Sequence, residues 1–142
     1  MEQLGQFILN HWALSAAFVV LLILIFLVEM RAQMNSAKGV SPQELVALMN
    51  HKQARVIDIR HADAFKGGHV IDALNLSQQE IEQKPKKLEK MKNNPIVIVC
   101  SNGQQSTSLA TALKQQGLDS VVALKGGMAA WNTADLPLVE GK

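Results

Sequence analysis

Residues 95–106 read Pro-Ile-Val-Ile-Val-Cys-Ser-Asn-Gly-Gln-Gln-Ser. The β-branched run over residues 96–99 contains no polar position, which is typical of a strand buried on both faces of a parallel sheet. Cys100 follows at the carboxyl end of that strand, where open α/β sheets place their ligand chemistry. This stretch predicts a central strand that ends in a loop with a thiol at its start.

The loop itself consists of Ser101, Asn102, Gly103, Gln104, Gln105 and Ser106. Gly103 can adopt a positive φ, which would turn successive backbone N–H groups toward the sulfur. Those groups, together with the positive end of the following helix, favour a thiolate or a persulfide anion over a neutral thiol. A second interpretation stays open, in which Cys100 is a small buried apolar residue at the end of its strand.

Strands and helices alternate on both sides of this stretch. Apolar patterning predicts further strands over residues 55–59 and 121–124. Residues 41–44 (Ser-Pro-Gln-Glu) and 77–80 (Ser-Gln-Gln-Glu) form capping-box patterns that predict two helix starts. We therefore expect residues 41–142 to form a three-layer α/β domain around a central, mostly parallel sheet.

An apolar segment precedes this domain. Residues 12–28 carry no charge and, at ~1.5 Å per residue, reach about 25 Å along a helix. Residues 7–9 extend the apolar stretch, and Trp12 stands where an interfacial ring would lie. We expect one transmembrane helix over about residues 6–29.

In this division of the chain, residues 1–31 form the membrane anchor and residues 32–40 form a linker. A cleaved signal peptide is one alternative, although no Lys or Arg precedes the apolar run. A buried core helix is another, although residues 16–28 have no polar face.

Charge predicts the orientation of the anchor. All fourteen Lys and Arg residues follow the apolar run, beginning with Arg31. The positive-inside rule then places the N-terminus outside and the domain in the cytoplasm of a single-pass protein of the inner (plasma) membrane. That compartment is reducing, so Cys100 would remain a free thiol.

Composition excludes several classes of function. A single cysteine excludes an intramolecular disulfide and a multi-cysteine metal site, so we expect no metal and no cofactor. A net charge of +2 and 4% aromatic residues give no indication of nucleic-acid binding. The pairs Gly67-Gly68 and Gly126-Gly127 lack the continuation that a nucleotide-binding loop requires.

Several short segments follow one another from about residue 38 to the C-terminus. They are Val56-Ile57-Asp58-Ile59-Arg60, Asp63 with Phe65, Gly68-His69-Val70-Ile71-Asp72-Ala73-Leu74-Asn75, Val97-Ile98-Val99-Cys100, Leu124-Lys125-Gly126-Gly127, Trp131, and Leu136-Pro137. In this order and spacing they resemble a rhodanese domain. With its N-terminal helix, the whole chain is similar to the YibN-like group of membrane-anchored, single-domain bacterial rhodaneses.

The resemblance implies sulfur transfer, in which the loop cysteine accepts the outer sulfur of a donor and passes it on to a thiophilic acceptor. It makes Cys100 the nucleophile and sulfur carrier and residues 101–106 the cradle around it. It also gives Asp58, Arg60 and His69 structural supporting roles, with Asp63 as a partner for Arg60.

The chain departs from the family pattern within the loop. Active rhodanese loops commonly read Cys-Arg-x-Gly-x-Arg, whereas Ser101 and Gln105 occupy the two arginine positions here. Each arginine would provide cation–anion hydrogen bonds worth ~1.5–3 kcal/mol, so we expect thiosulfate to bind poorly. A less charged or protein-bound donor remains compatible with the loop, and the missing guanidinium counts against a phosphatase.

Two functions therefore stand as hypotheses. The first is a membrane-anchored sulfurtransferase that carries sulfane sulfur on Cys100, with a small-molecule or protein donor and a thiol acceptor. The alternative is a catalytically weak or inactive rhodanese-like module that binds a membrane protein through its helix and domain. Membrane lipids are expected partners in both, and a basic cluster could contact anionic headgroups: Lys84, Lys86, Lys87, Lys90 and Lys92.

Overall fold

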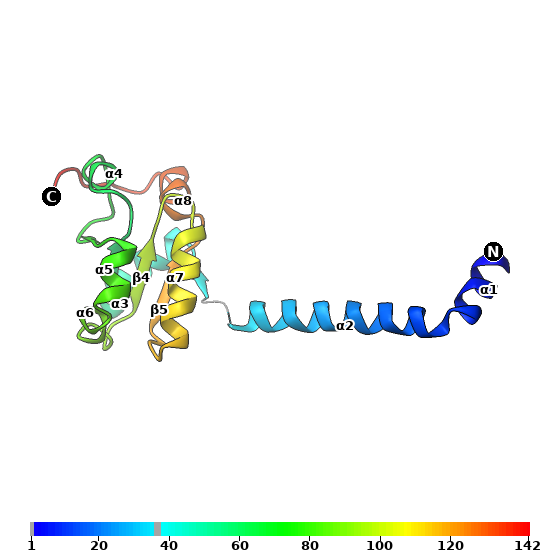
Figure 1. Ribbon diagram of the computed structural model, residues 1–142. Coiled ribbons are helices and arrows are strands. Elements are labelled where there is room, and N and C mark those ends of the chain that lie inside the picture. The colour runs from blue at the N-terminus through cyan, green and yellow to red at the C-terminus, as the bar shows by residue number, and fades with distance from the viewer. Residues whose placement is uncertain (1, 36–37) are drawn as a thin grey trace. The chain divides into compact units, whose positions relative to one another are not determined.

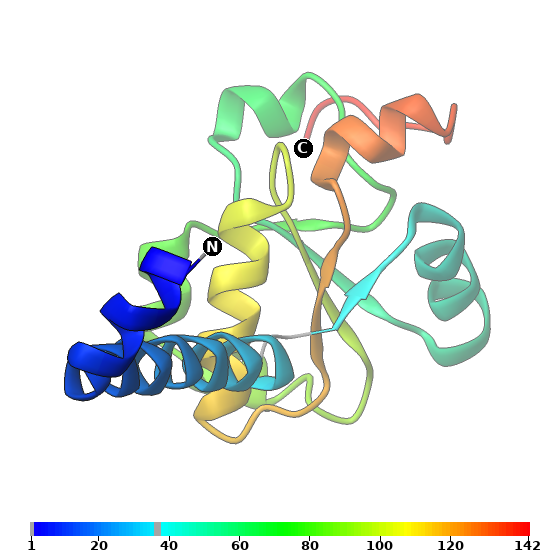
Figure 2. The same cartoon turned by 90° about the vertical axis from the view of Figure 1, so that its right-hand side faces the viewer.

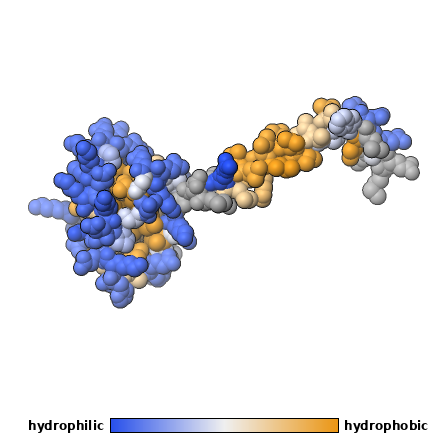
Figure 3. Space-filling view, turned by 90° about the horizontal axis from the view of Figure 1, so that it is seen from below, coloured by the Kyte–Doolittle hydropathy of each residue, from blue (hydrophilic) through white to orange (hydrophobic). Residues whose placement is uncertain are grey.

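The computed structural model describes residues 2–35 and 38–142, and the chain divides into two compact units, Met1–Asn35 and Ser36–Lys142. The N-terminal unit contains helices α1 (Glu2–Asn10) and α2 (Trp12–Asn35) (Figure 1). The stretch Trp12–Arg31 is long and apolar enough to cross a membrane, and none of it is buried. Figure 3 shows most of this stretch in orange, the colour of hydrophobic residues, with a blue hydrophilic patch at one end. The helix is a candidate transmembrane span.

The N-terminal unit differs in detail from the single helix expected over residues 6–29. The chain turns at His11, between α1 and α2. The His11 N–H donates to the Phe7 carbonyl at 3.0 Å, and the two rings stack with centroids 4.6 Å apart. Asn10 and His11 are polar, so they interrupt the apolar surface at the point where the helix bends.

The region expected to be a linker, residues 32–40, is only partly irregular. α2 continues to Asn35, and Gly39–Val40 form strand β1. Residues 36 and 37 lie outside the described part of the chain.

The second unit is built on a five-stranded sheet. Its strands are β1 (Gly39–Val40), β2 (Arg55–Asp58), β3 (Leu74–Asn75), β4 (Ile96–Val99) and β5 (Val121–Leu124). They lie in the order β1-β5-β4-β2-β3, and every pair is parallel. The expected parallel sheet is confirmed, with β4 at its centre. β1 and β3 escape sequence patterning because two residues are too short to show an alternation.

Helices cover both faces of the sheet, and Figure 2 shows α7 and α3 on opposite sides of it. Ile96 and Ile98 of β4 point into one core, while Val97 and Val99 point into the other. The first core is completed by α5 (Gln78–Gln83), α6 (Lys86–Glu89) and α7 (Gln104–Gln115), and the second by α3 (Pro42–Lys52) and α8 (Gly127–Thr133). A short α4 (Ala62–Lys66) follows β2. Burial on both faces explains why β4 has no polar position.

Both expected capping boxes are present. The Glu44 N–H donates to the Ser41 hydroxyl at 3.2 Å, and the Ser41 N–H donates to the Glu44 carboxylate at 2.6 Å. Ser77 and Glu80 repeat the arrangement at the start of α5, at 3.2 and 2.8 Å. These local interactions fix where α3 and α5 begin, as the sequence predicts.

Candidate functional site

Cys100 follows β4 directly and has only 1% of its surface exposed. It continues the alternation of the strand, so it belongs to the same core as Ile98 and Leu109. By burial alone it could be an apolar core residue. The polar contacts of its sulfur separate the two interpretations.

Backbone N–H groups of the loop converge on that sulfur. The Gly103 N–H donates to Sγ of Cys100 at 3.0 Å, and the Ser106 N–H does so at 3.4 Å. Gly103 has a φ of +90°, the positive value expected for the turn. The loop therefore wraps its donors around the thiol, which is an environment built for an anion rather than for an apolar side chain.

The Ser106 hydroxyl completes this shell. Sγ of Cys100 donates to it at 3.3 Å, and the hydroxyl itself donates to the Gly103 carbonyl at 3.1 Å. A hydroxyl proton rotates freely, so on ionisation of the thiol it can turn toward the sulfur. Asn102 also lies near the sulfur, with its Oδ1 3.9 Å from Sγ.

These contacts control the ionisation of Cys100. Burial raises the pKa of the thiol because it removes water from the charged form. Hydrogen bonds from the Ser106 hydroxyl and from the backbone N–H groups of Ser106, Gly103 and Asn102 lower it by more, so the pKa lies below its ordinary value. The loop thus favours a thiolate.

The orientation of the loop depends on the first turn of α8. The Met128 N–H donates to the Cys100 carbonyl at 2.8 Å, and the Ala129 N–H donates to the Ser101 carbonyl at 3.0 Å. Gly127 makes this approach possible, because a Cβ there would lie 2.2 Å from the Cys100 carbonyl oxygen and 2.7 Å from the Gly103 nitrogen. The carbonyls of Cys100 and Ser101 therefore point to α8, and the Asn102 N–H, which shares a peptide unit with the Ser101 carbonyl, can face the sulfur.

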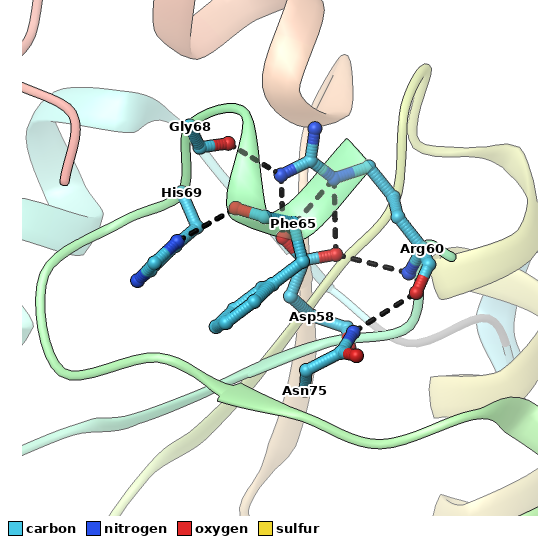
Figure 4. A network of polar contacts seen from close by, with 6 residues as sticks. All are labelled: Asp58, Arg60, Phe65, Gly68, His69 and Asn75. Carbon is cyan, nitrogen blue, oxygen red and sulfur yellow. Dashed lines mark hydrogen bonds and ion pairs between the residues drawn. The ribbon is translucent and has the colours of Figure 1, made fainter. Parts of the chain in front are cut away.

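A polar network lies at the carboxyl end of β2 (Figure 4). The Asp58 carboxylate is 1% exposed and accepts from the Arg60 guanidinium at 2.7, 3.0 and 3.1 Å and from the Arg60 N–H at 3.0 Å. Arg60 also donates to the Gly68 carbonyl at 2.7 Å. The Asn75 amide donates to the carbonyls of Asp58 and Arg60, at 3.0 and 2.9 Å. Asp58 lies in register with Val99, and the Ile59 N–H donates to the Val99 carbonyl at 2.9 Å, so the strand that carries this network pairs with the strand that ends at the thiol.

The expected pairing of Arg60 with Asp63 is wrong, because the ion pair is made with Asp58. His69, also in Figure 4, is buried and has its Nδ1 2.7 Å from the Phe65 carbonyl. Its ring stacks on Phe65, with centroids 3.7 Å apart, and its backbone exchanges two hydrogen bonds of 2.9 Å with Val139. These contacts tie the C-terminal segment to the domain.

The remaining loop residues face solvent. The side chains of Ser101, Gln104 and Gln105 are exposed, and the Gln104 N–H donates to the Asn102 Oδ1 at 3.1 Å. Within residues 2–35 and 38–142, no group of three or more His, Cys, Asp or Glu side chains is placed to hold a metal ion. Sequence reasoning did not foresee the contact of Gly127 with the loop, although a Gly-Gly pair after a strand is a signal of close backbone approach.

A cysteine-containing loop at the carboxyl end of a parallel α/β sheet is the arrangement of a protein class that comparison with known proteins identifies. The model of the rhodanese-like domain family matches residues 41–134, and the chain belongs to that family. Over 143 residues, spanning 100% of both chains, it is 34% identical to the protein YibN of Escherichia coli strain K12.

Further relatives match about three quarters of the chain. The thiosulfate sulfurtransferase GlpE of Shewanella oneidensis is 33% identical over 102 residues, which are 72% of this chain and 99% of that protein. The crystal structure of a rhodanese-related protein from Thermoplasma volcanium matches with a TM-score of 0.66 and 23% identity, covering 73% of this chain and 99% of that one. The structural match shows the fold.

We predict that Gly127→Ala destabilises the domain by roughly 2–5 kcal/mol, because the added methyl group meets backbone atoms at a residue with positive φ. Gly117→Ala is the matched control: its φ is +98°, but no atom lies within 4 Å of its Cβ position, so it should cost only about 1 kcal/mol. Urea unfolding of the full chain in detergent measures both, followed by the fluorescence of buried Trp131 in a Trp12→Phe background that removes the second tryptophan. Equal losses of stability would show that the close approach is not required.

We predict that Ser106→Ala raises the pKa of Cys100, because it removes a hydroxyl that lowers that pKa. Ser108→Ala, which removes an exposed hydroxyl of the same helix, should leave the titration unchanged. The ultraviolet absorbance of the thiolate reports the titration cleanly, since the chain has one cysteine and no tyrosine. Identical titration midpoints for Ser106→Ala and the unmodified chain would show that the Ser106 hydroxyl does not lower the pKa of Cys100.

Proposed function

We propose that the chain is a membrane-anchored sulfurtransferase in which Cys100 carries sulfane sulfur as a persulfide. The observation that carries this proposal is the convergence of the Gly103 and Ser106 N–H groups on Sγ. Such donors stabilise negative charge on a thiolate and, after sulfur uptake, on the persulfide. Membership of the rhodanese-like family and the similarity to GlpE, a thiosulfate sulfurtransferase, support it.

The proposed reaction has two displacement steps. In the first, the Cys100 thiolate attacks the outer sulfur of the donor and forms a new S–S bond. The bond from that sulfur to the rest of the donor breaks, and the leaving group departs with the electron pair, as sulfite when the donor is thiosulfate. In the second, an acceptor such as cyanide or a thiolate attacks the terminal sulfur of the persulfide, and Cys100 leaves as the thiolate. No external oxidant or reductant is needed.

The loop limits which donors react well. Ser101 and Gln105 are neutral, so neither provides a charged hydrogen bond to an anionic donor. Each missing cation–anion hydrogen bond weakens binding by ~1.5–3 kcal/mol. A low-molecular-weight or protein-bound persulfide therefore suits this loop better than thiosulfate does.

We predict that the full chain in detergent gains the mass of one sulfur on exposure to a persulfide donor, and more slowly with thiosulfate. Cyanide or a thiol should then remove that sulfur. Intact-mass spectrometry measures both steps, and Cys100→Ser is the control that should gain nothing because it has no thiol. A folded chain that gains sulfur from neither donor would overturn the proposed function.

A second candidate function is that of a catalytically weak module that binds a membrane protein partner. The neutral Ser101 and Gln105 side chains favour it, because they weaken donor binding without affecting the fold. Ala13 and Ala17 are exposed on α2 at a spacing of four residues, which would let a second helix approach closely. The mass measurement separates the two functions, since a binding module has no need to hold sulfur.

We further propose that α2 spans the inner membrane once, with the N-terminus outside and the rhodanese-like domain in the cytoplasm. The apolar span Trp12–Arg31 and the position of all fourteen Lys and Arg residues after Val28 support this orientation. The lysines of the basic cluster (residues 84, 86, 87, 90 and 92) are exposed. Near an anionic leaflet each would contribute about 1 kcal/mol of attraction.

Trypsin tests this orientation, because it cleaves after Lys and Arg. We predict that the chain in right-side-out vesicles stays full-length under trypsin, since every cleavage site would lie inside. Detergent added to the same vesicles should make the chain sensitive, which controls for intrinsic resistance. Digestion in intact vesicles would place the domain outside and contradict the proposed topology.

A further inference from the structure

An open cavity of about 650 Å³ lies beside the Cys100 loop. Its walls come from two segments far apart in the sequence: the loop with the first turns of α7, and the turn that joins β5 to α8. The side chains that line it belong to Asn102, Gln104, Thr107, Ser108 and Lys125, and carbon atoms make up most of its surface. Lys125 is the one charged residue among those that line it.

The position of Lys125 is defined by the sheet. It follows Leu124, which is fully buried at the end of β5, and its N–H donates to the Val40 carbonyl at 2.8 Å. Its aliphatic stem runs past Gly39, where a Cβ would lie 2.5 Å from Cγ and 3.1 Å from Cε of the lysine. Gly39 does not have a positive φ, so its backbone does not require glycine. The missing side chain instead makes room for the lysine.

One carboxylate competes for this charge. Hydrogen bonds from Ser41 lower the pKa of Glu44, and the charge of Lys125 lowers it further, so the two groups are within electrostatic range. The Glu44 carboxylate already accepts the Ser41 N–H at 2.6 Å. Because Lys125 and Glu44 are both exposed, their attraction is weak and leaves the ammonium group free for a ligand.

We propose that Lys125 is the cation that receives the charged end of an anionic sulfur donor beside the Cys100 loop. The ammonium group offers three N–H donors to sulfonate-type oxygens, and the exposed side chains of Ser108 and Gln104 offer further donors. Because Ser101 and Gln105 are neutral, the loop has no cation of its own. Lys125 in the β5–α8 turn then provides the positive charge that arginines at those two positions would provide. This inference rests on the proposed sulfurtransferase function and names the residue that selects the donor.

Two probes isolate the effect of donor charge. Thiosulfate is a dianion whose outer sulfur is attacked with departure of sulfite. Methyl methanethiosulfonate is neutral, and the same thiolate displaces methanesulfinate from it and acquires a methylthio group. Both reactions form one S–S bond at Cys100 and break one S–S bond in the probe, so their rates respond equally to the reactivity of the thiol.

The rates are measured by intact mass on the full chain in detergent. We expect Lys125→Gln to slow the thiosulfate reaction about fivefold to tenfold and to leave the thiosulfonate reaction within about twofold. Lys125→Arg should retain most of the thiosulfate rate. Lys114→Gln, which removes the same charge from the last turn of α7, is the matched control and should behave like the unmodified chain. Added salt should slow the thiosulfate reaction of the unmodified chain but not that of Lys125→Gln.

Failures of the two proposals give different results. Equal thiosulfate rates for Lys125→Gln and the unmodified chain overturn the role of Lys125 and leave sulfur transfer intact. Sulfur uptake from a persulfide donor without any from thiosulfate also overturns it, because the lysine then fails to recruit the dianion. Uptake from neither donor, with normal reaction of the thiosulfonate, overturns the sulfurtransferase function itself.

Discussion

The contact between the first turn of α8 and the start of the Cys100 loop is the constraint on which the site depends. Each peptide unit of the loop has one carbonyl and one N–H, and the two point in opposite directions. By accepting hydrogen bonds from Met128 and Ala129, the carbonyls of Cys100 and Ser101 are held toward α8. The Ser101 carbonyl shares its peptide unit with the Asn102 N–H, which can then face the sulfur and help to lower the pKa of Cys100. Gly127 is the requirement behind this arrangement, because any side chain there would separate the two segments.

That arrangement resolves a conflict between packing and chemistry. Cys100 must continue the apolar alternation of β4 to fill the core, yet a buried thiolate is costly without compensation. The loop supplies that compensation locally, from backbone N–H groups and one hydroxyl, and brings no charged side chain into the core. The sulfur therefore fills space in the core, while hydrogen bonds from the loop replace water around it and stabilise the thiolate. Charge selection is left to residues outside the loop.

The sequence reveals the parts of this structure that arise from local rules. The β-branched run predicts β4, the capping boxes predict the starts of α3 and α5, and Gly103 after the thiol predicts the positive φ of the turn. Contacts between distant segments have no such signature. The approach of Gly127 to Gly103 joins residues far apart in the chain, and the two-residue strands β1 and β3 exist only because β5 and β2 pair with them. Lys125 could not be identified as a candidate site residue from the sequence, because only the fold brings it beside the loop.

The Asp58–Arg60 network supports the site by position rather than by net stability. A buried ion pair gains little relative to an apolar pair, because desolvation offsets much of the attraction, but removal of one partner leaves an unpaired charge and costs about 3–5 kcal/mol. The network instead fixes the positions of its members, because the Asp58 carboxylate binds Arg60 and Arg60 donates to the Gly68 carbonyl. Asp58 stands in register with Val99, the residue before the thiol. The Ile59 N–H donates to the Val99 carbonyl at 2.9 Å, so β4 stays paired with β2 up to the residue before Cys100.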